Sequence, residues 1–174
     1  MLAWLARRTA MKFTKVVLIG AMMISPISAF AGEANVTYGK FNDFTDVRPS
    51  NEARGGYHKR VEKQFTKHFQ KLAEQLPEGY KLGIKVNDID LAGDVRFGGA
   101  NELRIVKPIY FPKIKFSYAL TDANGKIVDK GDADLKDMSF MDKIRRGREE
   151  EFMHDKRIIT DWFENELLPK VNNY

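Results

Sequence analysis

The densest group of side chains that could do chemistry lies in residues 87–94, NDIDLAGD. Asp88, Asp90 and Asp94 are closely spaced oxygen donors, and Gly93 permits a tight turn between them. Hard cations such as Ca²⁺ prefer several oxygen ligands at this density. However, the closing glutamate of an EF-hand loop is missing, and aspartates in short turns commonly accept backbone N–H groups. We therefore assign no metal ligands and keep these three aspartates as candidates only.

The three histidines do not form an evident catalytic or metal-binding set. His58 and His68 are ten residues apart on one predicted helix, roughly 15 Å along its axis, which is too far to bind one ion. His154 lies in or before the last predicted helix. The chain has no Cys. It also lacks the HExxH motif of zinc proteases, the GxSxG motif of serine hydrolases and the GxxxxGK phosphate-binding loop. We predict no catalytic residues and no cofactor.

The charge distribution argues against a nucleic-acid partner. The formal net charge is +5, but Arg7, Arg8, Lys12 and Lys15 supply four of these charges, so residues 32–174 carry +1. A balanced domain has no general field that attracts nucleic acid. One basic run, KIRRGR at 143–148, could contact phosphate or lipid headgroups. The acidic residues 149–151 follow it directly, which favours a solvated, partly neutralised loop.

The first 31 residues are predicted to be a cleaved signal peptide. Lys12 and Lys15 precede an uncharged apolar run at 16–24, Pro26 breaks the helix, and Ala29-Phe30-Ala31 resembles a signal peptidase site. The apolar run is much shorter than the ~20 residues of a membrane-spanning helix. Either Met1 or Met11 could be the start of translation. We expect cleavage before residue 32 and a periplasmic protein consisting of one domain, residues 32–174, with no transmembrane segment.

Two segments have the periodicity of amphipathic helices. In residues 57–76, large apolar residues recur every three or four positions and form one stripe. Residues 149–168 have a broad apolar face centred on Trp162, which we expect to be buried against a sheet, and Pro169 is expected to end the helix.

Four segments are predicted as strands: 35–40, 80–86, a long one at 104–121, and 126–135. Asn124-Gly125 predicts a hairpin turn between the last two, and residues 87–100 are predicted as a loop. Pro108 and Pro112 place the first half of the long strand at an edge or a bulge. The order strand, helix, three strands, helix predicts an α+β fold: a mainly antiparallel sheet of about four strands covered by two amphipathic helices.

The order of several sequence blocks resembles the family called domain of unknown function 3016, which consists of small exported proteins of Gram-negative bacteria. The blocks are VTYGKFNDFTDVRP, LPEGYKLGIKVNDIDLAGDV, IYFPKIKFSYALTDANGKIVDKGDADLKDM and DKRIITDWF, which together cover most of residues 32–174. The resemblance implies an exported, periplasmic domain. It implies no activity and no site residues.

Two functions from different classes remain open at this point. The first is a non-enzymatic periplasmic binding or envelope-accessory domain, whose partner is a periplasmic protein or a small ligand. Tyr38, Tyr110, Phe111 and Tyr118 could line a groove for it, accept a partner strand by edge addition, or else pack in the core. The second is a metal-assisted hydrolase that uses the carboxylates of the 88–94 segment. The absence of a recognisable catalytic constellation favours the first.

Overall fold

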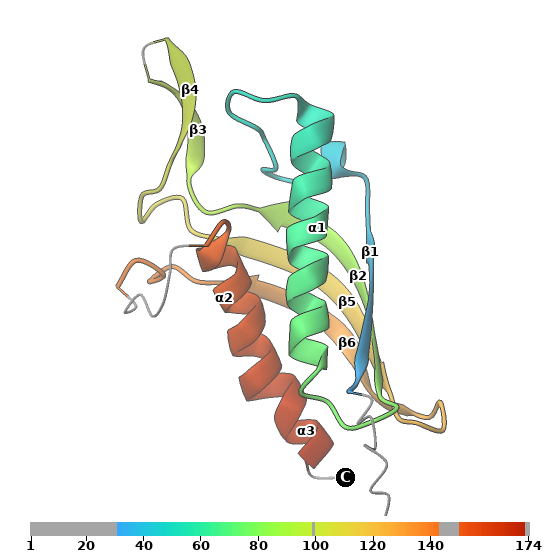
Figure 1. Cartoon of the computed structure of the whole chain (residues 1–174). Helices are drawn as coiled ribbons and strands as arrows, with labels where there is room; N and C mark the ends of the chain where they lie inside the picture. The colour runs from blue at the N-terminus through green and yellow to red at the C-terminus, as the bar shows by residue number, and fades with distance from the viewer. Residues whose placement is uncertain (1–30, 99, 143–149, 173–174) are drawn as a thin grey trace, which may run out of the picture.

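A computed structural model describes residues 31–98, 100–142 and 150–172. They form a four-stranded sheet in the order β1-β2-β5-β6, a separate two-stranded hairpin β3-β4, and helices that lie on one face of the sheet (Figure 1). The bounds are β1 Glu33–Tyr38, α1 Arg54–Ala73, β2 Lys81–Asp90, β3 Asp94–Gly98, β4 Asn101–Ile105, β5 Lys113–Thr121, β6 Ile127–Lys136, α2 Met153–Trp162 and α3 Leu168–Asn172.

The predicted α+β class and the four-stranded sheet are confirmed, but the predicted order of elements is not fully matched. The additional hairpin β3-β4 interrupts the meander between β2 and β5. In addition, β1 pairs with β2 in parallel, whereas β2-β5 and β5-β6 are antiparallel. A parallel pair needs a long crossover connection, and α1 supplies it.

Two of the predicted loop and strand boundaries were wrong. Residues 87–100 are not one loop, because β2 continues to Asp90 across a bulge after Val86 while paired with β5, and β3 begins at Asp94. The predicted strand 104–121 is two strands, β4 and β5, separated by residues 106–112. Pro108 and Pro112 lie in this interruption, where neither has to donate a ladder hydrogen bond.

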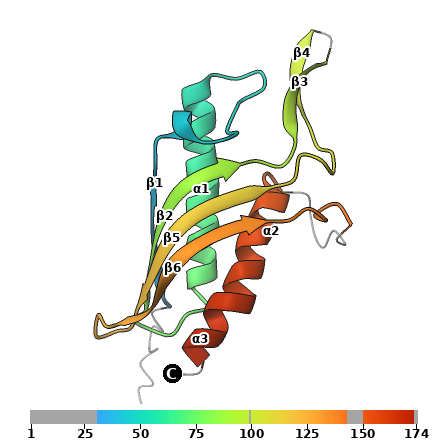
Figure 2. The same ribbon diagram turned by 180° about the vertical axis from the view of Figure 1, so that it is seen from behind.

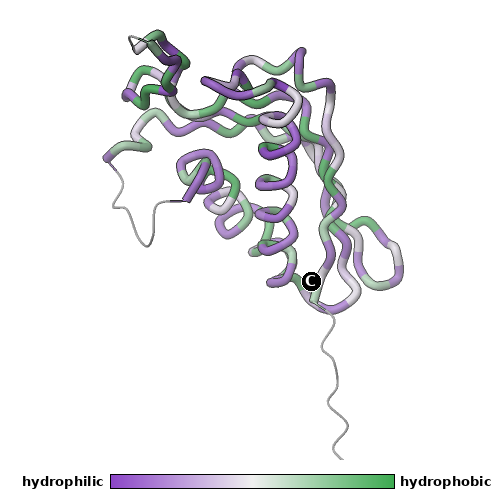
Figure 3. The backbone as a smooth tube through the Cα atoms, turned by 45° about the horizontal axis from the view of Figure 1, so that its top comes forward, coloured by the Kyte–Doolittle hydropathy of each residue, from purple (hydrophilic) through white to green (hydrophobic). Residues whose placement is uncertain are grey.

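One face of the sheet is covered and the other is open. Leu82, Ile84 and Val86 of β2 point toward the helices, whereas Lys81 and Lys85 point away. Figure 2 shows the uncovered face from behind, and in Figure 3 apolar and polar residues alternate along these strands. This alternation is the expected result of covering a strand on one side only.

The first helix follows its sequence periodicity. All six residues of the predicted stripe are buried: Tyr57, Val61, Phe65, Phe69, Leu72 and Leu76. The helix itself begins and ends three residues earlier than predicted, at Arg54 and Ala73, and Leu76 packs in the turn that follows.

The C-terminal helix is continuous but changes its winding. After α2, residues Phe163–Leu167 form a π-helical turn, and α3 continues to Asn172. The prediction that Pro169 ends the helix was therefore wrong. Pro169 is the second residue of α3, directly after the π turn, and proline is tolerated in a first helical turn because that position needs no intrahelical N–H donor.

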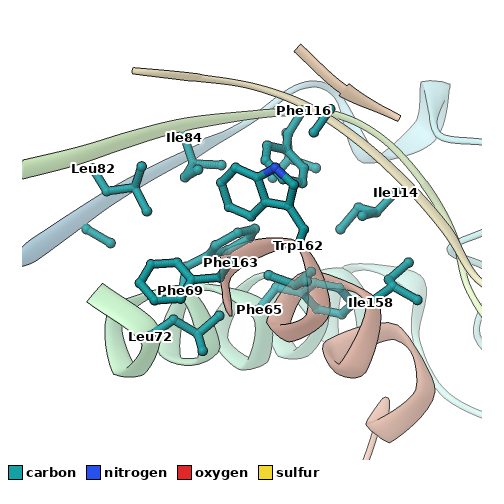
Figure 4. Packing of buried hydrophobic residues seen from close by; sticks show 14 of the residues in the cluster. Phe65, Phe69, Leu72, Leu82, Ile84, Ile114, Phe116, Ile158, Trp162 and Phe163 are labelled. Carbon is teal, nitrogen blue, oxygen red and sulfur yellow. The ribbon is translucent and has the colours of Figure 1, made fainter. Parts of the chain in front are cut away.

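Trp162 lies at the centre of the core, as predicted. Its side chain is between the sheet and α1 (Figure 4), and the residue is only 3% exposed. The indole makes edge-on contacts with Phe116 and Tyr118 of β5, with ring centroids 4.8 and 5.0 Å away. These contacts join the last helix to the middle of the sheet.

Within the described residues, no helix is both long enough and apolar enough to cross a membrane.

Candidate functional site

A cavity of about 570 Å³ lies where the N-terminal turns of α1 and α2 meet the base of the β3-β4 hairpin. α1 contributes Tyr57 and Arg60, the segment before α2 contributes Phe152, and β4 contributes Arg104. In Figure 1 both helices begin at the end of the sheet from which the hairpin projects. The volume is in the range of small-molecule sites, about 300–1,000 Å³.

Arg104 fixes the hairpin to the body of the protein and forms one wall of the cavity. Its guanidinium donates to both carboxylate oxygens of Asp46, at 2.9 and 3.3 Å. It also donates to the carbonyl oxygens of Gly93 at 2.8 Å and Arg48 at 2.9 Å. The positive charge is therefore matched inside the protein, and the donors are committed to holding the hairpin.

Asp155 is a buried carboxyl group on the opposite wall. The residue is 5% exposed, and its Oδ1 accepts a hydrogen bond from the backbone N–H of Ala92 at 2.9 Å. Its Oδ2 accepts no hydrogen bond from any other residue in the part of the chain that the structure describes. Burial raises the pKa of Asp155 from 3.8 to about 7, although the Ala92 N–H and Arg104 favour the charged form.

The mouth of the cavity is crossed by an ionic cluster. Arg60 donates to Glu151 at 2.8 Å and to both carboxylate oxygens of Glu52. The same guanidinium lies 5.1 Å from the ring centroid of Tyr57, which is a cation–π contact. Arg60 thus connects α1 to the segments that precede both helices.

Phe152 has an unusual backbone conformation at this site. It precedes α2 with φ 58° and ψ 31°, and is the one non-glycine residue with positive φ among residues 31–98, 100–142 and 150–172. Such a conformation costs about 1–3 kcal/mol and is concentrated at functional sites. The ring compensates by packing against Phe65 in the core, with centroids 5.8 Å apart, and near Tyr57 at 6.2 Å.

The three candidate aspartates are each occupied by a different partner. Asp88 accepts hydrogen bonds from the backbone N–H and the hydroxyl of Thr45, both at 2.7 Å. Asp90 pairs with Lys113 at 2.7 Å, and Asp94 pairs with Arg96 at 2.7 Å.

A metal site would require several His, Asp or Glu side chains to converge. Across the described residues, no three or more of these side chains are arranged to hold a metal ion. The geometry therefore gives no support to a carboxylate hydrolase at residues 88–94.

The histidines lie in three separate places. His58 stacks on Phe41, and one of its ring nitrogens is 3.2 Å from the carbonyl oxygen of Val47. His68 connects α1 to α2, with Nε2 2.9 Å from the carbonyl oxygen of Lys156, and burial lowers the pKa of His68 to about 4. Only His154 lines the cavity.

The predicted aromatic groove is not formed. Tyr38 of β1 bonds to Thr66 of α1, whereas Tyr118 packs on Trp162 in the core. The Tyr110 hydroxyl accepts a hydrogen bond from Arg96, and the ring of Phe111 makes a cation–π contact with Lys113. The basic run at 143–148 and the predicted signal peptide lie outside the described residues, apart from Ala31.

The residues that line the cavity were not identified as a site from the sequence. The sequence pattern places Tyr57 in a helical stripe and Arg104 at the start of a strand, and neither position indicates a cavity. Asp155 did leave a signal, because it lies three residues after Phe152 and seven before Trp162, on the apolar face of its helix. A charged residue on an apolar helix face marks a position that needs a partner or a ligand.

A family model described as "Protein of unknown function (DUF3016)" matches residues 32–165. No curated protein and no solved structure matches the chain.

Proposed function

The chain belongs to the family of proteins of unknown function DUF3016, and we propose that the protein is exported. From the cavity, we propose that it binds a small organic molecule. The proposal places the mature protein, residues 32–174, in the periplasm as a binding domain without catalysis. Export is supported by the signal-like pattern of residues 11–31. Binding is supported by the volume and composition of the cavity.

The single observation that carries the binding function is the combination of a ligand-sized cavity with converging polar groups. Small-molecule sites are concave, and they combine apolar walls with a few well-placed polar groups. Here Val106 and Met153 are apolar wall residues, and Arg60, Arg104 and Asp155 are the polar ones.

The structure also offers a reason for binding rather than turnover. The arginine donors are committed to protein partners, Arg104 to Asp46 and Arg60 to Glu52 and Glu151. The described lining contains no nucleophile hydrogen-bonded to a base, so we assign binding rather than covalent catalysis to this site.

A fragment screen followed by amide chemical-shift mapping on residues 32–174 tests the binding function. We expect hits to shift the amides of Tyr57, Ala92 and Met153 together. Val106→Trp fills the cavity from a half-exposed position and should abolish these shifts. Ile127→Trp, at a comparably exposed position on β6 away from the cavity, is the matched control and should retain them.

Two outcomes would contradict the binding function: no hits on the cavity residues, or hits that survive in Val106→Trp. Export is tested separately by N-terminal sequencing of the protein from the periplasmic fraction. We expect Gly32 as the first residue, and a protein that keeps its N-terminus in the cytoplasm would overturn that part of the proposal.

A further inference from the structure

The charges around the cavity are unequal, and this inequality bears on the ligand. Among the described residues, four acidic ones line it, Glu52, Glu150, Glu151 and Asp155, against Arg60 and Arg104. Arg104 is already neutralised by Asp46, which lies behind the cavity wall. Arg60 is shared by two of the carboxylates. The described part of the lining is therefore acidic before any ligand enters.

Among the described residues near this end, Lys156 only partly offsets the acidic excess. Lys156 lies 3.7 Å from Glu150, whose side chain is highly exposed, and donates a hydrogen bond to Gln64. Lys156 itself is nearly buried, but the Glu150 carboxylate is solvated, so a pair at this distance contributes little. Asp155, deep in the wall, has no lysine or arginine within ion-pair distance in the described residues.

The N-terminal end of α2 does not reverse this preference. A helix N-terminus favours anions through its unpaired N–H groups. Here the protein's own carboxylates occupy that environment, because Glu150 and Glu151 directly precede the helix and Asp155 is in its first turn. An anionic ligand would have to approach these three groups.

We infer that the ligand is a small organic cation with an apolar body, a primary amine or a guanidinium, whose charged group pairs with Asp155. This inference rests on the proposed function of the cavity. The Oδ1 of Asp155 is held by the Ala92 N–H, which orients the carboxyl group and leaves Oδ2 to accept from the ligand. A cation there offsets the cost of burying the carboxylate, which is greatest when the charge has no partner.

The rest of the wall fits the remainder of such a molecule. Met141, Met153 and Val106 can contact an apolar body, and methionine side chains adapt to irregular shapes. The ring of Tyr57 already accommodates one guanidinium, that of Arg60, at 5.1 Å. Aromatic faces attract organic cations in the same way.

Three probes with one body and different charges test the inference by calorimetry: 2-phenylethylamine, 2-phenylethanol and phenylacetate. We expect the amine to bind at least about tenfold more tightly than the alcohol, which corresponds to 1.4 kcal/mol, and phenylacetate to bind more weakly than both. Asp155→Asn should remove the advantage of the amine and leave the alcohol unchanged. Asp132→Asn makes the same chemical change on the open face of the sheet and should alter nothing.

The results separate the two proposals. Preference for the alcohol or for phenylacetate, or an unchanged amine affinity in Asp155→Asn, overturns the cation while leaving the binding function intact. If none of the three probes binds, the charge of the cavity hits from the fragment screen decides: mainly cationic hits support the inference, and mainly neutral or acidic hits overturn it. A screen without cavity hits overturns both proposals.

Discussion

Replacing Asp155 by Asn should change how the stability of the protein depends on pH. In the native state, burial raises the pKa of Asp155 to about 7, against an ordinary value of 3.8. Below pH 3.8, Asp155 is protonated in both the folded and the unfolded chain, so it does not make the stability depend on pH. Between the two values, the folded chain holds the proton and the unfolded chain does not, so stability falls as the pH rises.

The size of the effect follows from these two pKa values. A tenfold change in an ionisation constant is worth 1.36 kcal/mol, so the difference between 3.8 and about 7 amounts to about 4 kcal/mol above the upper value. The asparagine introduced by Asp155→Asn cannot ionise but can still accept the Ala92 N–H through its amide oxygen. The free energy of unfolding of Asp155→Asn minus that of the wild type should therefore increase by about 4 kcal/mol from about pH 4 to about pH 8.

Urea unfolding across this pH range, monitored by far-ultraviolet circular dichroism, gives the two free energies. The difference between variant and wild type is the informative quantity, because His68 and every other titrating group contribute to both proteins. Asp132→Asn makes the same chemical change at an exposed position and is the matched control. A flat difference for Asp155→Asn, or one that decreases with pH, would refute the argument that a buried, incompletely paired carboxyl group lines the cavity.

Three further predictions concern residues outside the cavity. Trp162→Ala should destabilise the protein by ~3–5 kcal/mol in the same unfolding assay. Trp162 is the one Trp in residues 32–174, and its native fluorescence should be blue-shifted because the side chain is buried. A water-like emission would contradict its burial. The pKa of His68 is about 4 in the folded chain against 6.5 in the unfolded chain, so the unfolded chain binds the proton first as the pH falls. Between these two values, the wild type should lose about 3 kcal/mol of unfolding free energy relative to His68→Gln. Equal pH profiles of the two proteins would contradict this prediction. Calcium should leave the melting temperature unchanged, because Asp88, Asp90 and Asp94 have separate protein partners. If they formed a calcium site, calcium at 100 times the dissociation constant would add ~2.7 kcal/mol to the free energy of unfolding. Replacing all three by Asn would then remove that gain.

Features that depend on near neighbours in the chain could be predicted from the sequence. The stripe of α1, the alternation along β2 and the turn at Asn124-Gly125 follow from side-chain periodicity and from the positive φ that glycine adopts there, +79°. The burial of Trp162 followed from the same periodicity. Each is a property of about 20 residues or fewer, so no knowledge of the partner element is needed.

The pairing of segments and the position of the cavity depend on contacts between residues far apart in the chain. The parallel pairing of β1 with β2 and the division of 104–121 into two strands depend on hydrogen-bond partners that are distant in the chain. The cavity depends on longer contacts still: Arg104 reaches back 58 residues to Asp46, and Ala92 meets Asp155 across 63. Periodicity reports which face of an element is buried but not what lies against it. A site assembled from several separate segments therefore becomes evident only after the chain has folded.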